Sequence, residues 1–425
     1  MTFCYVVTTI GLLRPTLLPG LARIRRGPRT LQFGVDPRHA VVVELADEHT
    51  AAVVDLLDGT LTEQQLLSRA VRLGARSGDV RALLTALHAH GLLVAAHTLT
   101  CPPDLRAETA ALALRCAGRR AGPPAAGRRT GAPGVANRTP AQIMRGRAEA
   151  RVAVVGRGRL AAPIAVALAG SGVGHVRADL HGEVRPEETV LGLDPTAVGR
   201  PRSAAVTAAL RRTRTGAAKA ASATTAPRGA GGSGSAGVTA ALRDAAGSGS
   251  AAITAALRGA GGSASGAVTA APPGVRAGTG KPQLIVRVGA DQPVNLAATA
   301  LRRRGQAVLV VDIRDGVPVI GPFVAAGGSP CLGCLDRHRI DRDPAWPEIA
   351  AGLATAPPAE ACDLVTIMAA TGFAVSEVLA HLDGGTPGTT GAAVELVSPG
   401  ELRWRYWPRH PRCSCGSNRH DLGSP

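Results

Sequence analysis

The chain has 425 residues, which is enough for roughly two or three domains with substantial hydrophobic cores. Its 48 Lys and Arg residues against 31 Asp and Glu give a formal net charge of +17, yet aromatic residues make up only 2%. So few aromatic side chains leave little for nucleic acid bases to stack on. Many of the arginines also lie in the Pro- and Gly-rich stretch 101–150 and form no periodic helix face. The composition therefore argues against nucleic acid as a partner.

Residues 1–13 are apolar but carry no basic segment and no convincing cleavage site, so we interpret them as an N-terminal extension of uncertain role. We find no apolar run of the ~18–20 residues that a membrane-spanning helix needs. We therefore expect a cytoplasmic protein with no membrane partner. In that compartment the cysteines stay reduced, which favours metal binding over disulfides.

Residues 14–97 are predicted to form one small domain. Three short strands separated by turn residues come first, and three helices and a short final strand follow. The second helix is predicted to start at Thr62 and to bury Leu66 and Val71, and the third has an apolar stripe from Val80 to Leu87. This order is typical of a winged-helix (α+β) domain. The strands are expected within 14–26, 29–36, 40–46 and 92–96, and the helices within 49–59, 60–74 and 77–90.

The second half of the chain is predicted to be a separate domain. Residues 98–147 have the composition of a basic Pro- and Gly-rich linker, with one helical stretch, LRAETAALALR. From 148 to 425 the pattern alternates between strand and helix. A continuous apolar strand at 150–156, a Gly-rich turn, a helix and a strand at 175–180 form a βαβ unit. We expect a Rossmann-like α/β fold with a mostly parallel sheet.

A low-complexity insert at 204–280 is predicted to interrupt this domain. The motif VTAALR occurs at 206 and 238, ITAALR at 253 and VTAA at 268, with GSGS-type spacers between the later copies. Each copy is too short and too poor in bulky side chains to build a helical solenoid. We expect no specific function for it. The regular pattern then returns in strands at 282–289, 306–313, 317–324, 392–398 and 402–407 and helices at 194–212, 292–305 and 364–384.

Four cysteines form the strongest chemical pattern. Cys331 and Cys334 make a CxxC motif, and Cys413 and Cys415 make a CxC motif near the C-terminus. Structural zinc sites use four such thiolates in a closed tetrahedron. A redox role for the CxxC pair is one alternative, but it leaves the CxC pair unexplained; four unrelated cysteines are the other. We predict a structural zinc ion. Further candidate ligands nearby are His338 and His410.

A glycine-rich loop follows the first strand of the βαβ unit. Gly156, Gly158 and Ala161 fit the pattern G-x-G-x-x-G/A, in which glycines let the backbone approach a phosphate at a helix N-terminus. Asp179 ends the next strand, where an acid can accept a hydrogen bond from a ribose hydroxyl. The pattern fits either a nucleotide site or a remnant of one, so ATP as a cofactor stays an open prediction.

The βαβ start, the VGRPRSAA helix, the run PCLGCLDRHRIDRDPAWP and the terminal WPRHPRCSCG together resemble one protein family. They are similar to the ubiquitin-activating-enzyme-like (ThiF-like) partner proteins of azole-forming ribosomal peptide biosynthesis. The resemblance implies that the four cysteines are zinc ligands and that 14–97 is a PqqD-like element that binds a precursor leader peptide. It also implies a YcaO-family cyclodehydratase as partner, which uses ATP to form thiazoles and oxazoles. A homodimer stays open.

The glycine loop departs from the adenylating members of that family. Those members carry a second acid where this chain has His181, and an Asn-x-x-Arg element that GEVRPEETVLG lacks. Arg200 and Arg202 occupy the region where they use a lysine. Without these groups the charge on a transferred acyl-phosphate is poorly stabilised. We therefore predict a binding scaffold with no catalytic residues. An active ThiF-type adenylyltransferase and a winged-helix DNA-binding regulator are the alternatives.

The N-terminal domain is the predicted peptide-binding element. A winged helix with an open sheet edge can accept an extended peptide as an additional strand. The alternative for its apolar residues is ordinary core packing, and for its polar residues solvation. A DNA-binding regulator needs a basic recognition helix, but SGDVRALLTALHAHG has a single arginine. The candidate peptide-binding residues are Val41, Val43, Arg81, Leu83, Leu87 and His88.

Overall fold

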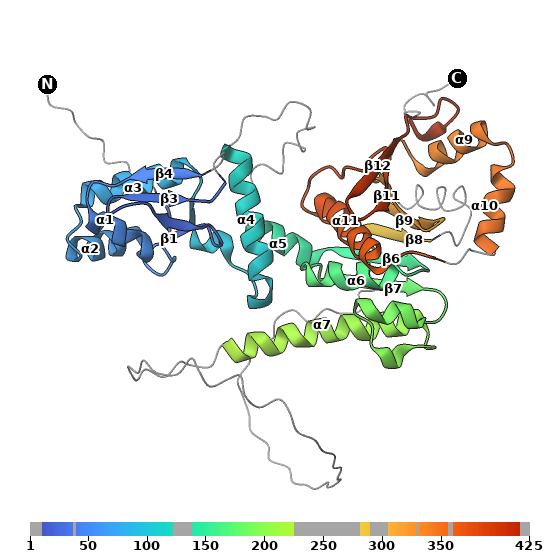
Figure 1. Ribbon diagram of the computed structural model, residues 1–425, viewed down its shortest axis with the longest axis horizontal. Coiled ribbons are helices and arrows are strands. Elements are labelled where there is room, and N and C mark those ends of the chain that lie inside the picture. The colour runs from blue at the N-terminus through green and yellow to red at the C-terminus, as the bar shows by residue number, and fades with distance from the viewer. Residues whose placement is uncertain are drawn as a thin grey trace, which may run out of the picture.

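The computed structural model describes residues 11–36, 40–121, 138–224, 281–289, 305–328, 330–355 and 360–416. An N-terminal unit and a larger unit built on a seven-stranded sheet are joined by two helices, α4 (Arg106–Ala121) and α5 (Pro140–Glu149) (Figure 1). Short 3-10 turns occur at Val54–Leu56, Ala96–Leu99, Pro103–Leu105, Pro186–Leu191, Pro195–Ala197 and Ser414–Gly416.

The N-terminal unit packs three helices against a small antiparallel sheet. Its strands β2 (Arg23–Arg25), β3 (Thr30–Phe33) and β4 (Val41–Glu44) are hydrogen-bonded in that order, so β4 is an edge strand. The first predicted strand segment forms two strands, because β1 (Pro15–Leu17) leaves this sheet and pairs with β5 (Leu93–Ala95). The helices are α1 (Glu48–Val53), α2 (Glu63–Arg72) and α3 (Ser77–Ala89).

Local sequence explains where α2 begins and which face it buries. Thr62 accepts a hydrogen bond from the N–H of Gln65, and the Gln65 side chain accepts one from the N–H of Thr62, as the predicted cap requires. Leu66 is fully buried together with Ala70, one turn later. The prediction for Val71 was wrong: it is 52% exposed, because it lies about 100° around the helix from Ala70.

The range predicted as a linker contains two packed helices. Leu112 on α4 forms a small buried cluster with Ile143 and Met144 on α5. Thr139 caps α5 with a second reciprocal pair of hydrogen bonds, to Gln142. The high Pro and Gly content of the whole range concealed these apolar positions. Residues 122–137, which hold the most Gly-rich part, lie outside the described residues.

The sheet of the larger unit is mixed, whereas a mostly parallel sheet was predicted. Its order is β12-β11-β10-β9-β8-β6-β7; neighbours from β7 to β9 run parallel, and those from β9 to β12 run antiparallel. The strands are β6 (Arg151–Gly156), β7 (His175–Leu180), β8 (Leu284–Val288), β9 (Ala307–Arg314), β10 (Val317–Val324), β11 (Ala392–Ser398) and β12 (Glu401–Tyr406).

Two tight turns explain the antiparallel half. Only Asp315 and Gly316 separate β9 from β10, and both have positive φ, 51° and 83°. Only Pro399 and Gly400 separate β11 from β12. A parallel connection needs a crossover of a dozen or more residues, so two-residue turns can only make hairpins.

The two faces of the sheet are covered by different elements. One face carries Val152 and Val154 and packs with α6 (Ala161–Gly170), α7 (Arg202–Thr224) and α11 (Leu364–Leu382) in the main core. The opposite face carries Ala153, and there the strands pack with α9 (Leu332–Arg342) and three of the four motif cysteines. Helix α10 (Trp346–Thr355) follows α9 at the outer edge in Figure 1.

Helix α7 corrects the predicted start of the insert. It runs from Arg202 to Thr224, and Val206, in the first VTAALR copy, is fully buried in the main core. This copy is therefore part of a core helix and does not belong to a functionless insert. The copies at 238, 253 and 268 lie outside the described residues, as does almost all of the helix predicted at 292–305.

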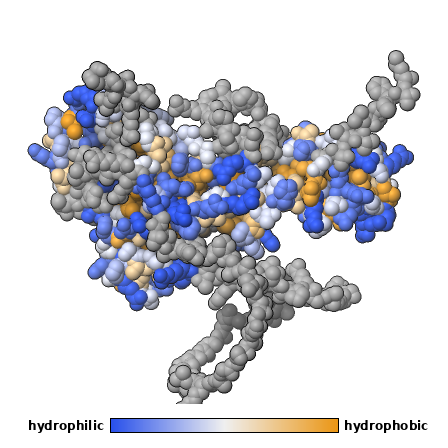
Figure 2. Space-filling model, turned by 180° about the vertical axis from the view of Figure 1, so that it is seen from behind, coloured by the Kyte–Doolittle hydropathy of each residue, from blue (hydrophilic) through white to orange (hydrophobic). Residues whose placement is uncertain are grey.

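Helix α11 is the one helix among the described residues that is long and apolar enough to cross a membrane, with 19 residues and a mean hydropathy of 1.5. This length of apolar run was not recognised from the sequence. Its inner face, including Ile367, Ala374 and Val378, is buried in the main core, as in a core helix of a globular unit. Seen from behind, hydrophilic and hydrophobic residues are interspersed on the visible surface of both units (Figure 2).

Candidate metal centre and glycine loop

The CxxC motif lies at the N-terminus of α9. Cys331 precedes the helix with extended backbone (φ −97°, ψ 174°), and Cys334 lies in the first turn, where its N–H donates to the Cys331 carbonyl at 2.9 Å. Gly333 stands between them. A Cβ on this residue would lie 3.5 Å from the Cys331 sulfur and 3.7 Å from the Cys413 sulfur. A small residue here leaves space for the sulfurs to gather on one side of the turn.

The CxC motif meets the CxxC motif after the last hairpin. The sulfur of Cys413 lies 3.7 Å from that of Cys331, although the two residues are 82 positions apart. The sulfur of Cys415 lies 3.3 Å from that of Cys334, and the Cys331–Cys334 distance is 4.0 Å. All four sulfurs lie within 4.8 Å of one another. The structure thus brings the predicted quartet together.

The geometry and chemistry of this cluster fit a metal ion. Four thiolates about 2.3 Å from zinc would be about 3.8 Å apart in a tetrahedron, which is close to the observed spacings. Burial raises the pKa of Cys331 to about 12 and also raises that of Cys334. Reactive redox thiols need a lowered pKa, so the redox alternative fits poorly. A bound cation would stabilise the thiolates, as in structural metal sites.

The two histidines near the cluster have other partners. His410 is 1% exposed; its Nε2 lies 2.7 Å from a carboxylate oxygen of Asp341, and its Nδ1 accepts from the N–H of Arg412 at 3.1 Å. His338 Nε2 lies 3.0 Å from the carbonyl of Pro408. With both ring nitrogens of His410 engaged, the four sulfurs form the candidate ligand set.

The glycine loop has the backbone shape that the motif predicts. Gly156 and Gly158 have φ values of +110° and +106°, which side-chain-bearing residues rarely adopt. A Cβ on Gly156 would lie 2.1 Å from the carbonyl of Val288 on the neighbouring strand β8. Ala161 begins α6 and is fully buried. These residues therefore build a tight strand-to-helix turn.

Asp179 lies where the motif requires its acid. It is exposed near the end of β7 and pairs in register with Val155, one residue before the glycine loop. Just after β7, the N–H of His181 donates to the carbonyl of Gly156 at 2.8 Å, which ties the ends of the two strands together. The loop and the acid thus both lie at the carboxyl-terminal end of the parallel strands β6 and β7, as in a mononucleotide-binding half.

Arg202, which stands near the lysine position of adenylating relatives, is occupied in an internal ion pair. Its guanidinium binds the Glu188 carboxylate in a two-point contact, with distances of 2.8 and 2.6 Å, and both side chains are almost fully buried. It also donates to the backbone carbonyls of His181 and Glu183. Arg200 is exposed. These contacts give Arg202 a structural role.

Sequence reasoning missed one residue at the glycine loop, Glu360. Its carboxylate Oε2 accepts a hydrogen bond from the N–H of Arg159 at 2.6 Å. A Cβ on Gly158 would lie 2.1 Å from its Oε1, so the carboxylate fills the space that the missing side chain leaves. Glu360 comes 201 positions after Arg159 and belongs to no motif, so no local pattern could have revealed it.

The predicted peptide-binding residues fall into three groups. Val41 and Val43 on β4 are partly buried and pack against the N-terminal core. Leu83 and Leu87 on α3 lie inside this core, at 4% and 0% exposure, and have no surface for a peptide in this structure. They belong to the stripe from Val80 to Leu87 that packs α3 into this core, and their role in peptide binding stays a prediction. Of the polar pair, Arg81 is half-buried and His88 is exposed.

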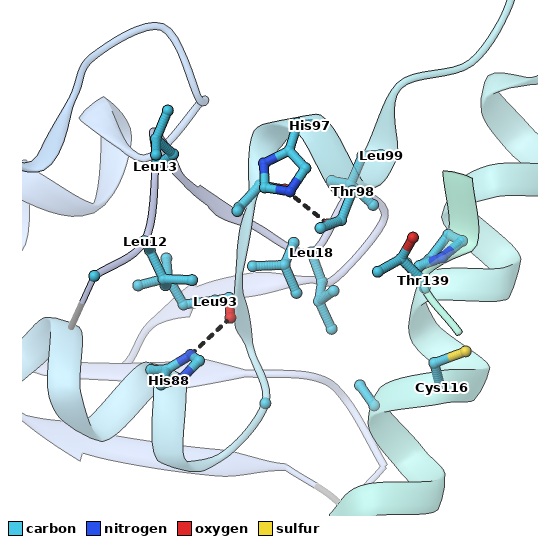
Figure 3. A pocket seen from close by; sticks show the side chains of 17 residues that line it. Leu12, Leu13, Leu18, His88, Leu93, His97, Thr98, Leu99, Cys116 and Thr139 are labelled. Carbon is cyan, nitrogen blue, oxygen red and sulfur yellow. Dashed lines mark hydrogen bonds between the residues drawn. The ribbon is translucent and has the colours of Figure 1, made fainter. Parts of the chain in front are cut away.

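An apolar cavity of about 310 Å³ lies between the N-terminal unit and helices α4 and α5 (Figure 3). Leu12, Leu18 and Leu93 line one side, and Cys116 and Thr139 line the other. His88 reaches it from the end of α3, with Nδ1 3.3 Å from the carbonyl of Leu93. The sequence predicted a helical stretch within α4 but not α5, and it did not predict that either helix packs beside the N-terminal unit, so the cavity was not predicted.

The seven-stranded mixed sheet, its glycine loop and the helices on its core face define a mixed α/β protein with an added N-terminal unit. Solved structures share this fold. E. coli MccB is 12% identical with a TM-score of 0.52, and the match covers 95% of this chain and 97% of MccB. MccB in complex with AMPCPP and MccA is 13% identical with a TM-score of 0.54, covering 94% and 99%.

The heterocyclase TruD also has this fold, at 13% identity and a TM-score of 0.51. The match covers 95% of this chain but only 42% of TruD. A further MccB structure is described as the microcin C7 biosynthetic enzyme in complex with N-formylated MccA. No family model matches the sequence, and no curated protein matches it. At these identities the likeness shows a common fold.

Proposed function

We propose that this chain binds the leader of a ribosomal precursor peptide and delivers it to a separate YcaO-family cyclodehydratase for thiazole or oxazole formation. In this proposal the cysteine cluster holds a structural zinc ion that closes the larger unit, and the chain itself performs no catalysis. The single observation that carries the proposal is the outer edge of β4 in the N-terminal unit, with which no other strand of the described ranges pairs.

The register of β4 determines which backbone groups are free to bind a peptide. The N–H of Leu45 donates to the carbonyl of Arg29, next to β3, at 2.7 Å. Hydrogen-bonding direction alternates along a strand, so Val41 and Val43 face β3, while the N–H and C=O groups of Val42 and Glu44 face away. An extended peptide can pair with these outward groups as a fourth strand.

The side chains of β4 fit the same role. Val41 and Val43 anchor the strand by packing against the N-terminal core, whereas Val42 is 49% exposed on the other face. Exposed edge strands invite pairing with another chain unless they are blocked by proline, a bulge or charge. β4 has no proline and no bulge, its three valines favour extended backbone, and its one charged residue is the exposed Glu44 at its end.

The comparisons support the proposal at the level of fold. The MccB structures that share the fold include complexes with its peptide MccA, and TruD is a heterocyclase. This chain matches less than half of TruD. In this proposal, heterocycle formation is assigned to the YcaO-family partner.

The second candidate function is adenylation, because one MccB structure contains ATP. Two contacts weigh against it: Arg202 is held by Glu188, and the Glu360 carboxylate fills the glycine loop. ATP–pyrophosphate exchange distinguishes the two functions. Exchange by the isolated chain with a precursor peptide would favour adenylation, and its absence alongside leader binding would favour the scaffold.

Reconstitution with a partner tests the proposal directly. The full chain is mixed with a YcaO-family enzyme and a Cys/Ser/Thr-rich precursor encoded in the same gene neighbourhood, and heterocycles are counted by mass spectrometry as lost water. We expect rapid heterocycle formation only when the chain and an intact leader are both present. A scrambled leader is the control. Equal rates without the chain would contradict the proposal.

A further inference from the structure

The contact between Glu360 and the glycine loop involves both the side chain and the backbone of the segment that carries it. The carboxylate accepts from the N–H of Arg159 at 2.6 Å. The Arg159 guanidinium then donates to the Glu360 carbonyl at 3.3 Å and to the carbonyl of Cys362. Two elements far apart in sequence, the turn after β6 and the segment before α11, are thereby held together.

The Glu360 carboxylate lies at the start of α6, where glycine-rich loops that precede a helix hold an anion. No side chain caps α6 at Leu160, the residue before its first turn, and the N–H of Ala161 donates to the carbonyl of Gly158 at 3.2 Å, so the N–H of Arg159 is the loop donor that the Glu360 carboxylate contacts. The N–H of Arg159 and the positive end of the helix dipole favour negative charge at this position. The absence of a Cβ on Gly158 makes the space in which the Glu360 carboxylate lies.

The surroundings of this carboxylate disfavour its charged form. Burial raises the pKa of Glu360 above its usual value, and the nearby acids Asp312 and Glu188 raise it further. The N–H of Arg159 and the charge of Arg202 act in the opposite direction but do not outweigh burial. A group in this position can be displaced by a ligand that satisfies the loop better.

The Arg159 side chain has a hydrogen-bond donor available for such a ligand. Among the described residues its Nε is buried and has no hydrogen-bond partner, while its terminal nitrogen donates to two backbone carbonyls. A phosphate group has more acceptor oxygens than a carboxylate and could bind both the N–H and the guanidinium of this residue.

We propose that Glu360 is an internal anion that closes the glycine loop, so that the chain supplies its own carboxylate where a nucleotide phosphate would otherwise bind. Loss of this carboxylate uncovers a site for a phosphate, pyrophosphate or nucleoside triphosphate at Gly158 and Arg159. The inference goes beyond leader binding and is independent of it, because the glycine loop and β4 belong to different units of the chain.

The test uses full-length protein and three variants. Glu360→Ala removes the carboxylate, Glu360→Gln keeps its shape without the charge, and Glu348→Gln changes an exposed glutamate on α10 as the matched control. The thermal unfolding midpoint and calorimetric binding are measured with inorganic phosphate, pyrophosphate and ATP in separate titrations. The three ligands distinguish a simple anion site from one that also recognises the nucleoside.

We expect wild type and Glu348→Gln to respond weakly to all three ligands. Glu360→Ala should bind pyrophosphate or ATP at least tenfold more tightly, with Glu360→Gln in between. If Glu360→Ala folds poorly, recovery of its unfolding midpoint on adding pyrophosphate gives the same support. Equal affinity in wild type and Glu360→Ala would overturn the proposal, as would failure of both Glu360 variants to bind or be stabilised by any of the three anions.

Discussion

Arg147 on α5 and Asp383 at the end of α11 form a buried two-point ion pair, with N–O distances of 2.7 and 2.6 Å. The Arg147 side chain is 1% exposed, and its third nitrogen donates to the carbonyl of Ser171 at 3.1 Å. Glu108 on α4 lies 3.7 Å away. One guanidinium therefore fastens the connecting helices to the larger unit.

Removing this guanidinium should destabilise the larger unit. Arg147→Met leaves the Asp383 carboxylate without its charged partner in a largely buried site, and we expect a loss of about 3 kcal/mol in the free energy of unfolding. Urea unfolding followed by circular dichroism measures it. Arg145→Met, an exposed neighbour on the same helix, should change stability by less than about 0.5 kcal/mol. Equal effects of the two substitutions would refute a special role for Arg147.

The cysteine cluster predicts one zinc ion per chain. Elemental analysis of the purified protein should find it, and Cys331→Ser or Cys413→Ser should remove it, because three thiolates no longer close the tetrahedron. We expect the unfolding midpoint to fall by at least about 5 °C, since a stability loss of 1 kcal/mol lowers the midpoint by roughly 2–4 °C for a folded unit of about 150–250 residues. A chelator should reproduce the shift. Cys101→Ser, outside the cluster, should keep both the metal and the midpoint.

Two substitutions at Val42 on β4 distinguish the contribution of backbone hydrogen bonds to leader binding from that of the side chain. Val42→Pro removes an N–H that faces away from β3, so the strand keeps its pairing while its outer edge loses a donor. We expect at least a tenfold weaker affinity for the leader, about 1.4 kcal/mol, by fluorescence anisotropy. Val42→Ala keeps the N–H and should bind within about twofold to threefold of wild type. Unchanged binding by the folded proline variant would rule out strand addition at β4.

Because the pKa of Glu360 is raised, the difference in stability between wild type and Glu360→Gln should depend on pH. A carboxyl group with a raised pKa in the folded state contributes stability below its unfolded pKa and loses it as pH rises through the folded pKa. Relative to Glu360→Gln, wild type should therefore become less stable as pH rises from about 4 to 7. Denaturant unfolding at several pH values checks this. A difference that grows in the opposite direction would show that the loop favours the charged carboxylate.

The cysteine cluster could be predicted because its information is local. The CxxC and CxC spacings fix how the sulfurs of each pair can point, and only the meeting of the two pairs depended on the fold. The glycine loop was predictable for the same reason: Gly156 and Gly158 indicate a backbone shape that only glycine adopts readily. In both cases the residue type itself carries the constraint.

Glu360 could not be predicted because its role depends on contacts across 201 positions of sequence. A single glutamate after a Pro-rich stretch has no spacing or periodicity to distinguish it. The antiparallel half of the sheet was a different failure. Gly316 and Gly400 do mark two-residue turns, so the hairpins were visible in the sequence, but strand–helix alternation elsewhere was given too much weight.

The placement of the four sulfurs has a consequence for how the larger unit would respond to a broken backbone. Cys334 and Cys413 bracket most of α9 together with α10, α11 and the last hairpin, so a shared ion would bridge the two ends of that whole stretch. If a protease cut the chain once between α9 and β11, a bound ion would link the two pieces in addition to the pairing of β10 with β11 and the shared core.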